Sequence, residues 1–202
     1  MAHLEKGSKK LMNAWAFYDW ANSVYTLVIA SAIFPLYYGA LFKIKGTNYI
    51  DAFGTTIKSS ALISFVTAAA FLVVAIISPL LSGIADYAGN KKSFMQFFCY
   101  LGAFSCIGLF WFDLDQIYIS LTCYFFGLIG YWGSIVFYNS YLPDVAFPEQ
   151  QDNLSARGYS MGYIGSVLLL VFNLAMVLMP DIFGFTGTEG EMAMKAMRFS
   201  FV

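Results

Sequence analysis

The sequence predicts an all-α protein, a polytopic transmembrane helical bundle with five complete helices and the start of a sixth. Hydrophobic residues make up 59% of the 202-residue chain and charged residues only 11%, whereas a soluble domain carries about 25% charged residues. The chain also holds five charge-free runs that reach the roughly 20 residues a helix needs to cross a bilayer. These runs lack the alternation of a membrane β-barrel, so the spanning segments are expected to be helices.

The first helix is expected over residues 14–42, around the charge-free run Trp20–Phe42. Aromatic residues at both of its ends indicate the two membrane interfaces. They are Trp15, Phe17, Tyr18 and Trp20 at the start, and Tyr37 and Tyr38 at the end. The stretch is too long and too aromatic for the core of a cleavable signal peptide, so we interpret it as a membrane helix.

The next three helices are expected over residues 59–85, 93–112 and 116–142. The links between them, residues 86–92 and 113–115, are short. Consecutive elements that are joined by short links usually lie side by side. We therefore expect these three helices to be sequential antiparallel neighbours.

The fifth helix is expected over residues 156–180, after a longer and more polar link. In this link Pro148 is expected to open a short interfacial helix, and Asn153 or Ser155 is expected to cap the fifth helix. A sixth helix is expected to begin near Met192 and to be cut off at Val202. Residues 192–202 are too few to cross a bilayer.

The distribution of Lys and Arg favours a cytoplasmic N-terminus, because these residues are enriched in cytoplasmic loops. With this orientation the inside segments hold Lys6, Lys9, Lys10, Lys91, Lys92 and Arg157, and the outside segments hold Lys43, Lys45, Lys58, Lys195 and Arg198. The turn at 113–115 has no positive residue, which suits the outside.

Composition also argues against several function classes. The net charge is −1 and no basic patch is present, so we predict no nucleic-acid partner. The only histidine is His3, and Cys99, Cys106 and Cys123 lie in apolar runs without a C-x-x-C pair. We therefore predict no metal and no cofactor. A membrane-embedded enzyme would need a catalytic constellation, and the sequence offers no Ser–His or metal-ligand spacing.

Asp19 is the strongest single candidate for a residue that contacts a substrate or couples transport to protons. Asn22 and Ser23 follow it by three and four residues, so the three are expected to share a helix face. A carboxylate within a bilayer is costly and usually faces a cavity or a partner. A contact with a substrate ammonium or a role in proton coupling is one interpretation. The other is an interfacial Asp in the first turn of a helix, favoured by the helix dipole.

The fourth helix carries a second polar cluster. Tyr131, Ser134 and Tyr138 fall on one face, and Asn139 follows them. The cluster is expected either to line a cavity for a polar solute or to form hydrogen bonds between helices. Small residues at three- or four-residue spacing in the fourth and fifth helices predict close helix packing; they are Gly127, Gly130, Gly133, Gly158, Gly162 and Gly165.

The link between the second and third helices is the most informative stretch. It contains Gly83, Asp86, Gly89, Lys91 and Lys92. Asp86 would lie at a helix C-terminus, which disfavours its charge, so we expect it to have a specific partner.

This link resembles the cytoplasmic signature between helices two and three of the major facilitator superfamily. Asp86, Gly89, Lys91 and Lys92 match the signature, whereas Ser82 replaces the first glycine, and Tyr87 and Asn90 replace basic residues. Residues 13–23, 138–143 and 154–158 resemble the vacuolar-effluxer-like branch of the superfamily. That branch is named for fungal vacuolar amino-acid exporters and has many bacterial members.

The resemblance implies a twelve-helix transporter with two six-helix halves and alternating access to a midplane site. Residues 1–202 would then form the N-terminal half, incomplete at the sixth helix, with helices one and four lining the cavity. Asp144 and Arg157 would lie at the cytoplasmic rim and help to gate it. The expected partners are the lipid bilayer, a small solute and the C-terminal half of the transporter, with protons as candidate coupling ions because of Asp19.

The expected function is secondary active transport of a small solute, with amino-acid efflux across a bacterial cytoplasmic membrane as the candidate process. A membrane scaffold that transports nothing is the alternative. A membrane-embedded enzyme is the least favoured.

Overall fold

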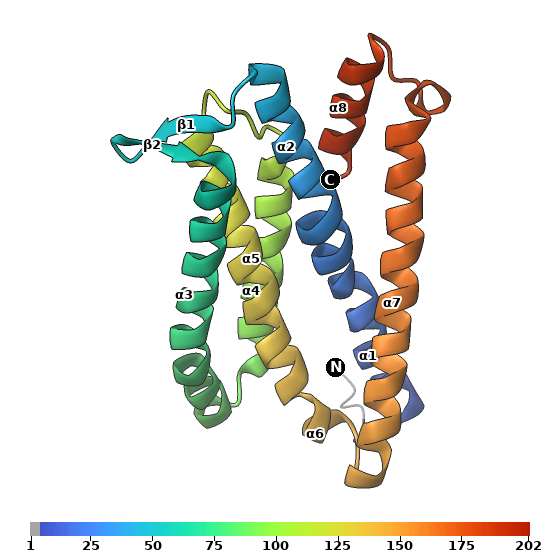
Figure 1. Cartoon of the computed structure of the whole chain (residues 1–202). Coiled ribbons are helices and arrows are strands. Elements are labelled where there is room, and N and C mark those ends of the chain that lie inside the picture. The colour runs from blue at the N-terminus through green and yellow to red at the C-terminus, as the bar shows by residue number, and fades with distance from the viewer. Residues whose placement is uncertain (1–4) are drawn as a thin grey trace.

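The computed structural model describes residues 5–202, except for the side chains of Ala85, Asp86 and Ala88. His3 therefore lies outside the described residues. Long helices run side by side along one axis (Figure 1). The elements are α1 (Lys9–Val24), the π-helix η1 (Tyr25–Ile33), α2 (Phe34–Lys45), β1 (Tyr49–Ala52), β2 (Thr55–Lys58), α3 (Ser59–Ala88), α4 (Lys91–Leu109), α5 (Ile117–Ser140), α6 (Leu142–Val145), α7 (Pro148–Leu178), the 3-10 helix η2 (Pro180–Phe183) and α8 (Glu189–Phe199).

Within the described part of the chain, four helices are long and apolar enough to cross a membrane. They cover Lys9–Lys45, Ser59–Ile84, Ile117–Ser140 and Pro148–Leu178. The length and composition of these helices confirm the prediction of a protein with several membrane-spanning helices. The helix α4 forms where the third helix was predicted but is not one of these four spans.

The first helix is continuous from Lys9 to Lys45, so it begins before the predicted residue 14. Its middle is the π-helix η1, where the amide of Phe34 bonds to the carbonyl of Ile29, five residues back. Pro35 follows directly. Proline cannot donate a backbone hydrogen bond and its ring crowds the carbonyl one turn back. Local π turns are one way in which membrane helices absorb a proline.

The sequence analysis did not anticipate a β-hairpin after the first helix. Strands β1 and β2 pair antiparallel, with Ala52 opposite Thr55. The turn residues Phe53 and Gly54 both have positive φ, at 54° and 77°. Two positive-φ residues are what a tight hairpin turn of matching twist requires.

The fifth predicted helix begins earlier than expected. Pro148 opens the long helix α7 itself rather than a separate interfacial helix, and Asn153 and Ser155 lie inside α7 rather than at its cap. Proline suits the first helical position because that amide needs no partner. Gln150 Oε1 accepts a hydrogen bond from the amide of Phe147 at 3.1 Å and so caps the helix start.

The sixth predicted helix also begins earlier, at Glu189 instead of Met192, and α8 ends at Phe199. Thr188 is its cap, and the amide of Thr188 donates to Glu191 Oε2 at 3.0 Å. The backbone and side-chain hydrogen bonds to Thr188 lower the pKa of Glu191, which lies outside the spanning helices.

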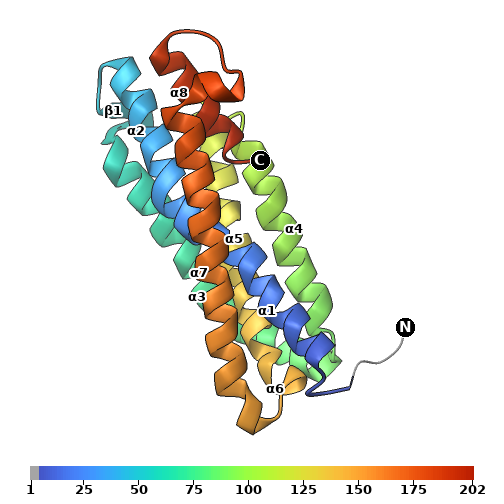
Figure 2. The same cartoon turned by 90° about the vertical axis from the view of Figure 1, so that its right-hand side faces the viewer.

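Helix packing corrects one expectation. The helices α3, α4 and α5 alternate in direction as predicted, but α3 packs mainly along α5 rather than along α4 (Figures 1 and 2). The helix α4 also packs along α5, and α1 packs along α7. Glycines allow the α4–α5 approach, because a side chain on Gly130 would collide with the backbone of Gly102. The packing role predicted for this glycine is confirmed.

Candidate functional site

A buried carboxylate lies between α1 and α7. Asp19 is only 7% exposed, and the Ser23 hydroxyl donates to its Oδ1 at 2.7 Å. Two α7 glycines face its other oxygen, since a Cβ atom would lie 3.4 Å from Oδ2 at Gly158 and 3.3 Å at Gly162. The carboxylate is thus enclosed by its own helix and by the bare backbone of α7.

Asn22 does not share this site, contrary to the prediction. Its Oδ1 accepts a hydrogen bond from Ser134 at 3.4 Å, and its buried Nδ2 has no partner among the described residues. Asn22 lines a different cavity of about 510 Å³, together with the buried Asn173 of α7. Positions three and four residues after Asp19 differ by about 100° around a helix. In the packing of α1 against α7, Ser23 therefore faces the Asp19 site, whereas Asn22 faces the second cavity.

Tyr138 of α5 forms an aromatic stack with α1. Its ring lies 4.2 Å from Trp15 and 5.1 Å from Tyr18, centroid to centroid. The Trp15 indole also donates to the Tyr138 carbonyl at 3.1 Å. The Tyr138 hydroxyl is buried and has no hydrogen-bond partner among the described residues. Its oxygen would lie 3.1 Å from a Cβ at Gly158, next to Asp19.

The other predicted α5 residues divide into exposed and buried groups. Tyr131 stacks on Tyr25 at 5.3 Å and accepts a long hydrogen bond of 3.5 Å from Thr26. Ser134 is fully buried and donates to the Tyr131 carbonyl at 2.7 Å, so its hydroxyl is not available to a solute. Asn139 is exposed at the end of α5. Of this predicted group, only Tyr131 lines a hollow with Ser23.

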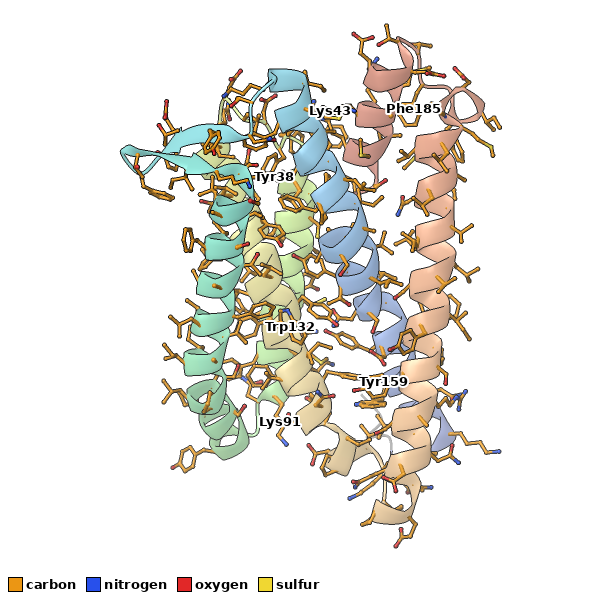
Figure 3. All side chains as sticks on the ribbon, viewed as in Figure 1. Tyr38, Lys43, Lys91, Trp132, Tyr159 and Phe185 are labelled. Atoms are coloured by element: carbon orange, nitrogen blue, oxygen red, sulfur yellow. The ribbon has the colours of Figure 1, made fainter. Side chains whose placement is uncertain are left out.

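That hollow has a volume of about 270 Å³ and lies between the end of α1, η1, α5 and α7; we call it the hydroxyl hollow. Figure 3 shows Tyr159 extending from α7 into the space beside α5. The lining residues are Ser23, Thr26, Leu27, Ser31, Tyr131, Tyr159, Gly162, Tyr163 and Ser166. Most of these side chains carry a hydroxyl group and none is charged.

The sequence analysis missed the α7 side of this hollow. Tyr159, Tyr163 and Ser166 recur at intervals of four and three residues, which places them on one helix face. That spacing was the available signal. Helices one and four were expected to line the cavity, and α7 adds a third wall to this hollow.

A charged contact joins helices at the α6 end of the bundle. Lys91 Nζ lies 3.0 Å from Asp144 Oδ2 and donates to the Ser140 carbonyl at 3.3 Å. Asp86 was predicted to have a specific partner, but its side chain lies outside the described part of the structure. Gly89 has a φ of +63° and forms the turn. The other predicted residues of this end, Gly83, Lys92 and Arg157, are exposed.

Arg198 of α8 makes the corresponding contact at the opposite end. Its Nε donates to the Tyr37 hydroxyl at 2.6 Å, and its guanidinium lies 3.5 Å from Asp113. Tyr37 in turn donates to the Phe112 carbonyl at 2.8 Å. This cluster ties α8 to α2 and to the loop between α4 and α5. Among residues 5–202 as described, no group of three His, Cys, Asp or Glu side chains could hold a metal ion.

Comparison with known proteins gives consistent matches over most of the chain. The model of the family described as "Vacuole effluxer Atg22 like" matches residues 7–197. An uncharacterized MFS-type transporter, YxiO of Bacillus subtilis, is 36% identical over 171 residues, which cover 84% of this chain and 38% of the relative. An uncharacterized protein of Aquifex aeolicus is 27% identical over 176 residues, covering 86% and 41%. The chain thus spans about two fifths of these relatives, and no solved structure matches it.

Proposed function

Since the chain belongs to the Atg22-like vacuole effluxer family of the major facilitator superfamily, we propose that it forms the N-terminal helical half of a secondary transporter for a small polar solute. The family is one of transporters, not of enzymes. The proposed mechanism is alternating access, in which two helical halves rock around a site near the middle of the membrane. The five complete helices and the start of a sixth would form the half that contains Asp19.

The observation that carries this proposal is the buried Asp19 carboxylate beside the hydroxyl hollow. Asp19 is the only Asp, Glu, Lys or Arg between Lys10 and Lys43. A charged group inside a membrane helix is rare because burial in hydrocarbon is costly, and where it occurs it usually marks a substrate or ion pathway. Here the charge lies where three helices meet, and a hollow of solute size opens next to it.

Within this function we propose that Asp19, Ser23 and Tyr131 contact the solute or couple its transport. Tyr138 is proposed to hold α1 in position, because its ring stacks on Trp15 and Tyr18. A proton on Asp19 would cancel the charge that Ser23 now stabilises, which is one way to couple transport to a proton gradient. An amino acid is the candidate solute and efflux is the candidate direction. The proposed location is a bacterial cytoplasmic membrane, with the N-terminus in the cytoplasm.

The contacts at the α6 end suggest how the inner side is held. Lys91 links the start of α4 to Asp144 of the short helix α6, which follows the spanning helix α5 at the proposed cytoplasmic rim. We propose that the link from Gly83 to Lys92 takes part in the conformational change of transport. Arg157 of α7 is proposed to lie at the cytoplasmic rim and help to gate it. These assignments predict effects on transport rate rather than on solute selection.

The test is solute exchange by the purified full-length protein in liposomes, with a panel of radiolabelled amino acids, sugars and amines. Saturable exchange of at least one solute, weakened by substitution in the hydroxyl hollow, is the expected result. Absence of exchange for every solute would overturn the transport proposal and leave a membrane scaffold as the better account.

A further inference from the structure

We propose that the β-hairpin and the apolar groove beneath it bind one acyl chain of a membrane phospholipid. The groove has a volume of about 390 Å³ and lies between the hairpin, α3 and α5; we call it the hairpin groove. Figure 1 shows the hairpin at the start of α3, where it projects from the bundle. The proposal depends on the spanning helices alone and stands whether or not the protein transports a solute.

The chemistry of the lining favours a hydrocarbon chain. Large apolar side chains such as Phe65 of α3 and Phe125 of α5 form the walls, and no charged side chain lines the groove among the described residues. Its two hydroxyl groups already have partners. Thr122 donates to the Tyr118 carbonyl at 2.7 Å, and the Tyr118 hydroxyl accepts from the Phe53 amide at 3.0 Å. An occupant therefore gains mainly by burying apolar surface.

The depth of the groove matches one leaflet of the bilayer. The helices α3 and α5 both begin at this end, at Ser59 and Ile117, and the groove reaches Ala69 on α3. At 1.5 Å per residue, the stretch from Ser59 to Ala69 covers about 15 Å. This is half of the roughly 30 Å hydrocarbon core. The hairpin then lies at headgroup level, where exposed aromatic residues such as Tyr49 and Tyr118 are usual.

The size of the lining residues favours a lipid chain over another helix of the transporter. Contacts between membrane helices are enriched in small residues, and the contact of Gly102 with Gly130 between α4 and α5 is an example. In the hairpin groove large side chains predominate instead. The helix α3 is also the least buried of the four spanning helices. This side of the bundle therefore suits contact with lipid.

Native mass spectrometry of the purified full-length protein tests for a retained lipid. The protein is loaded in detergent with phosphatidylethanolamine or phosphatidylglycerol, and the excess lipid is then removed. We expect a species with a single bound phospholipid for either headgroup, because the uncharged groove recognises the chain. Absence of a retained lipid, or retention that requires the anionic headgroup, would overturn the proposal.

Three variants assign the retained lipid to the groove. Ala69→Trp should abolish retention, because the indole would fill the groove from an exposed position. Ala75→Trp is the matched control, because Ala75 is also exposed on α3 but lies outside the groove. Phe53→Gly should weaken retention by removing the ring of the hairpin turn, and the φ of 54° at this residue suits glycine. Equal retention in Ala69→Trp and Ala75→Trp would refute the site.

Photolabelling in liposomes locates the bound chain. The probe is phosphatidylethanolamine with a photoreactive diazirine on its acyl chain. Label should concentrate on residues 62–69 and 118–125 and should be lost from these segments in Ala69→Trp. Label on exposed α3 side chains such as Ile76, with none in the groove, would mean that another part of the transporter covers the groove, and the proposal would be wrong.

Discussion

Gly162 of α7 lies so close to Ser23 of α1 that a Cβ at this glycine would come within 2.8 Å of the Ser23 hydroxyl oxygen and 3.3 Å of the Asp19 carboxylate. The two helices therefore touch through a bare backbone at the site of the buried charge. The hydrogen bond between Ser23 and Asp19 depends on that absence of a side chain.

The first prediction follows from this contact. Gly162→Ala should displace the Ser23 hydroxyl and destabilise the protein by about 1–3 kcal/mol, the usual range for overpacking. Solute exchange should fall with it, measured in liposomes beside the unfolding midpoint. Gly190→Ala is the control, because a Cβ at Gly190 meets nothing within 4 Å. Equal behaviour of the two variants would show that the contact has no effect.

Asp19→Asn tests the proton role. The amide keeps the shape of the carboxylate but cannot be ionised. We expect pH-driven uptake to be lost while exchange persists at saturating solute, with a raised KM. Uptake that still follows the pH gradient in this variant would rule out Asp19 as the coupling residue.

Tyr37→Phe tests the cluster of Arg198, Tyr37 and Asp113, which ties α8 to the rest of the bundle. The Tyr37 hydroxyl serves both Arg198 and the Phe112 carbonyl, and Phe112 is fully buried. Leaving a buried polar group unpaired costs about 1–3 kcal/mol, so the unfolding midpoint should fall. Tyr49→Phe provides the control, because that ring is 54% exposed on the hairpin. A Tyr37→Phe protein as stable as the control would contradict this account.

The contact between Lys91 and Asp144 should contribute little to stability. The side chains are 20% and 54% exposed, and ion pairs in such surroundings are usually worth about 0–1 kcal/mol. A double-mutant cycle with Lys91→Gln and Asp144→Asn should give a coupling energy in this range. The exchange rate should change more than the stability. A coupling of several kcal/mol would assign the pair to folding rather than to transport.

Cysteine labelling tests which α5 and η1 positions water reaches. In a background without Cys99, Cys106 and Cys123, Thr26→Cys should react with a charged thiol reagent because Thr26 lines the hollow. Ser134→Cys should not react, because Ser134 is fully buried. Labelling of neither would mean that water does not reach the hollow, and labelling of both would mean that water access is not confined to it.

Local sequence was sufficient to predict four spanning helices and the buried carboxyl group, although the predicted third helix, α4, is not among the spans. Long apolar runs without charges fold as helices wherever the backbone must satisfy its own hydrogen bonds. Asp19 was identified because a carboxylate in such a run is costly wherever the helix packs. The pairing of Asp19 with Ser23 was also within reach, since four residues make one helical turn.

Tertiary structure decided which faces meet, and that could not be read from one helix at a time. The bare glycines of α7 let its backbone reach Asp19 and bring Tyr159 and Tyr163 beside Thr26. The same packing turned Asn22 toward a second cavity and buried Ser134 against its own helix. Helical periodicity predicts which residues share a face, whereas close packing against a neighbouring helix selects the face that lines the site.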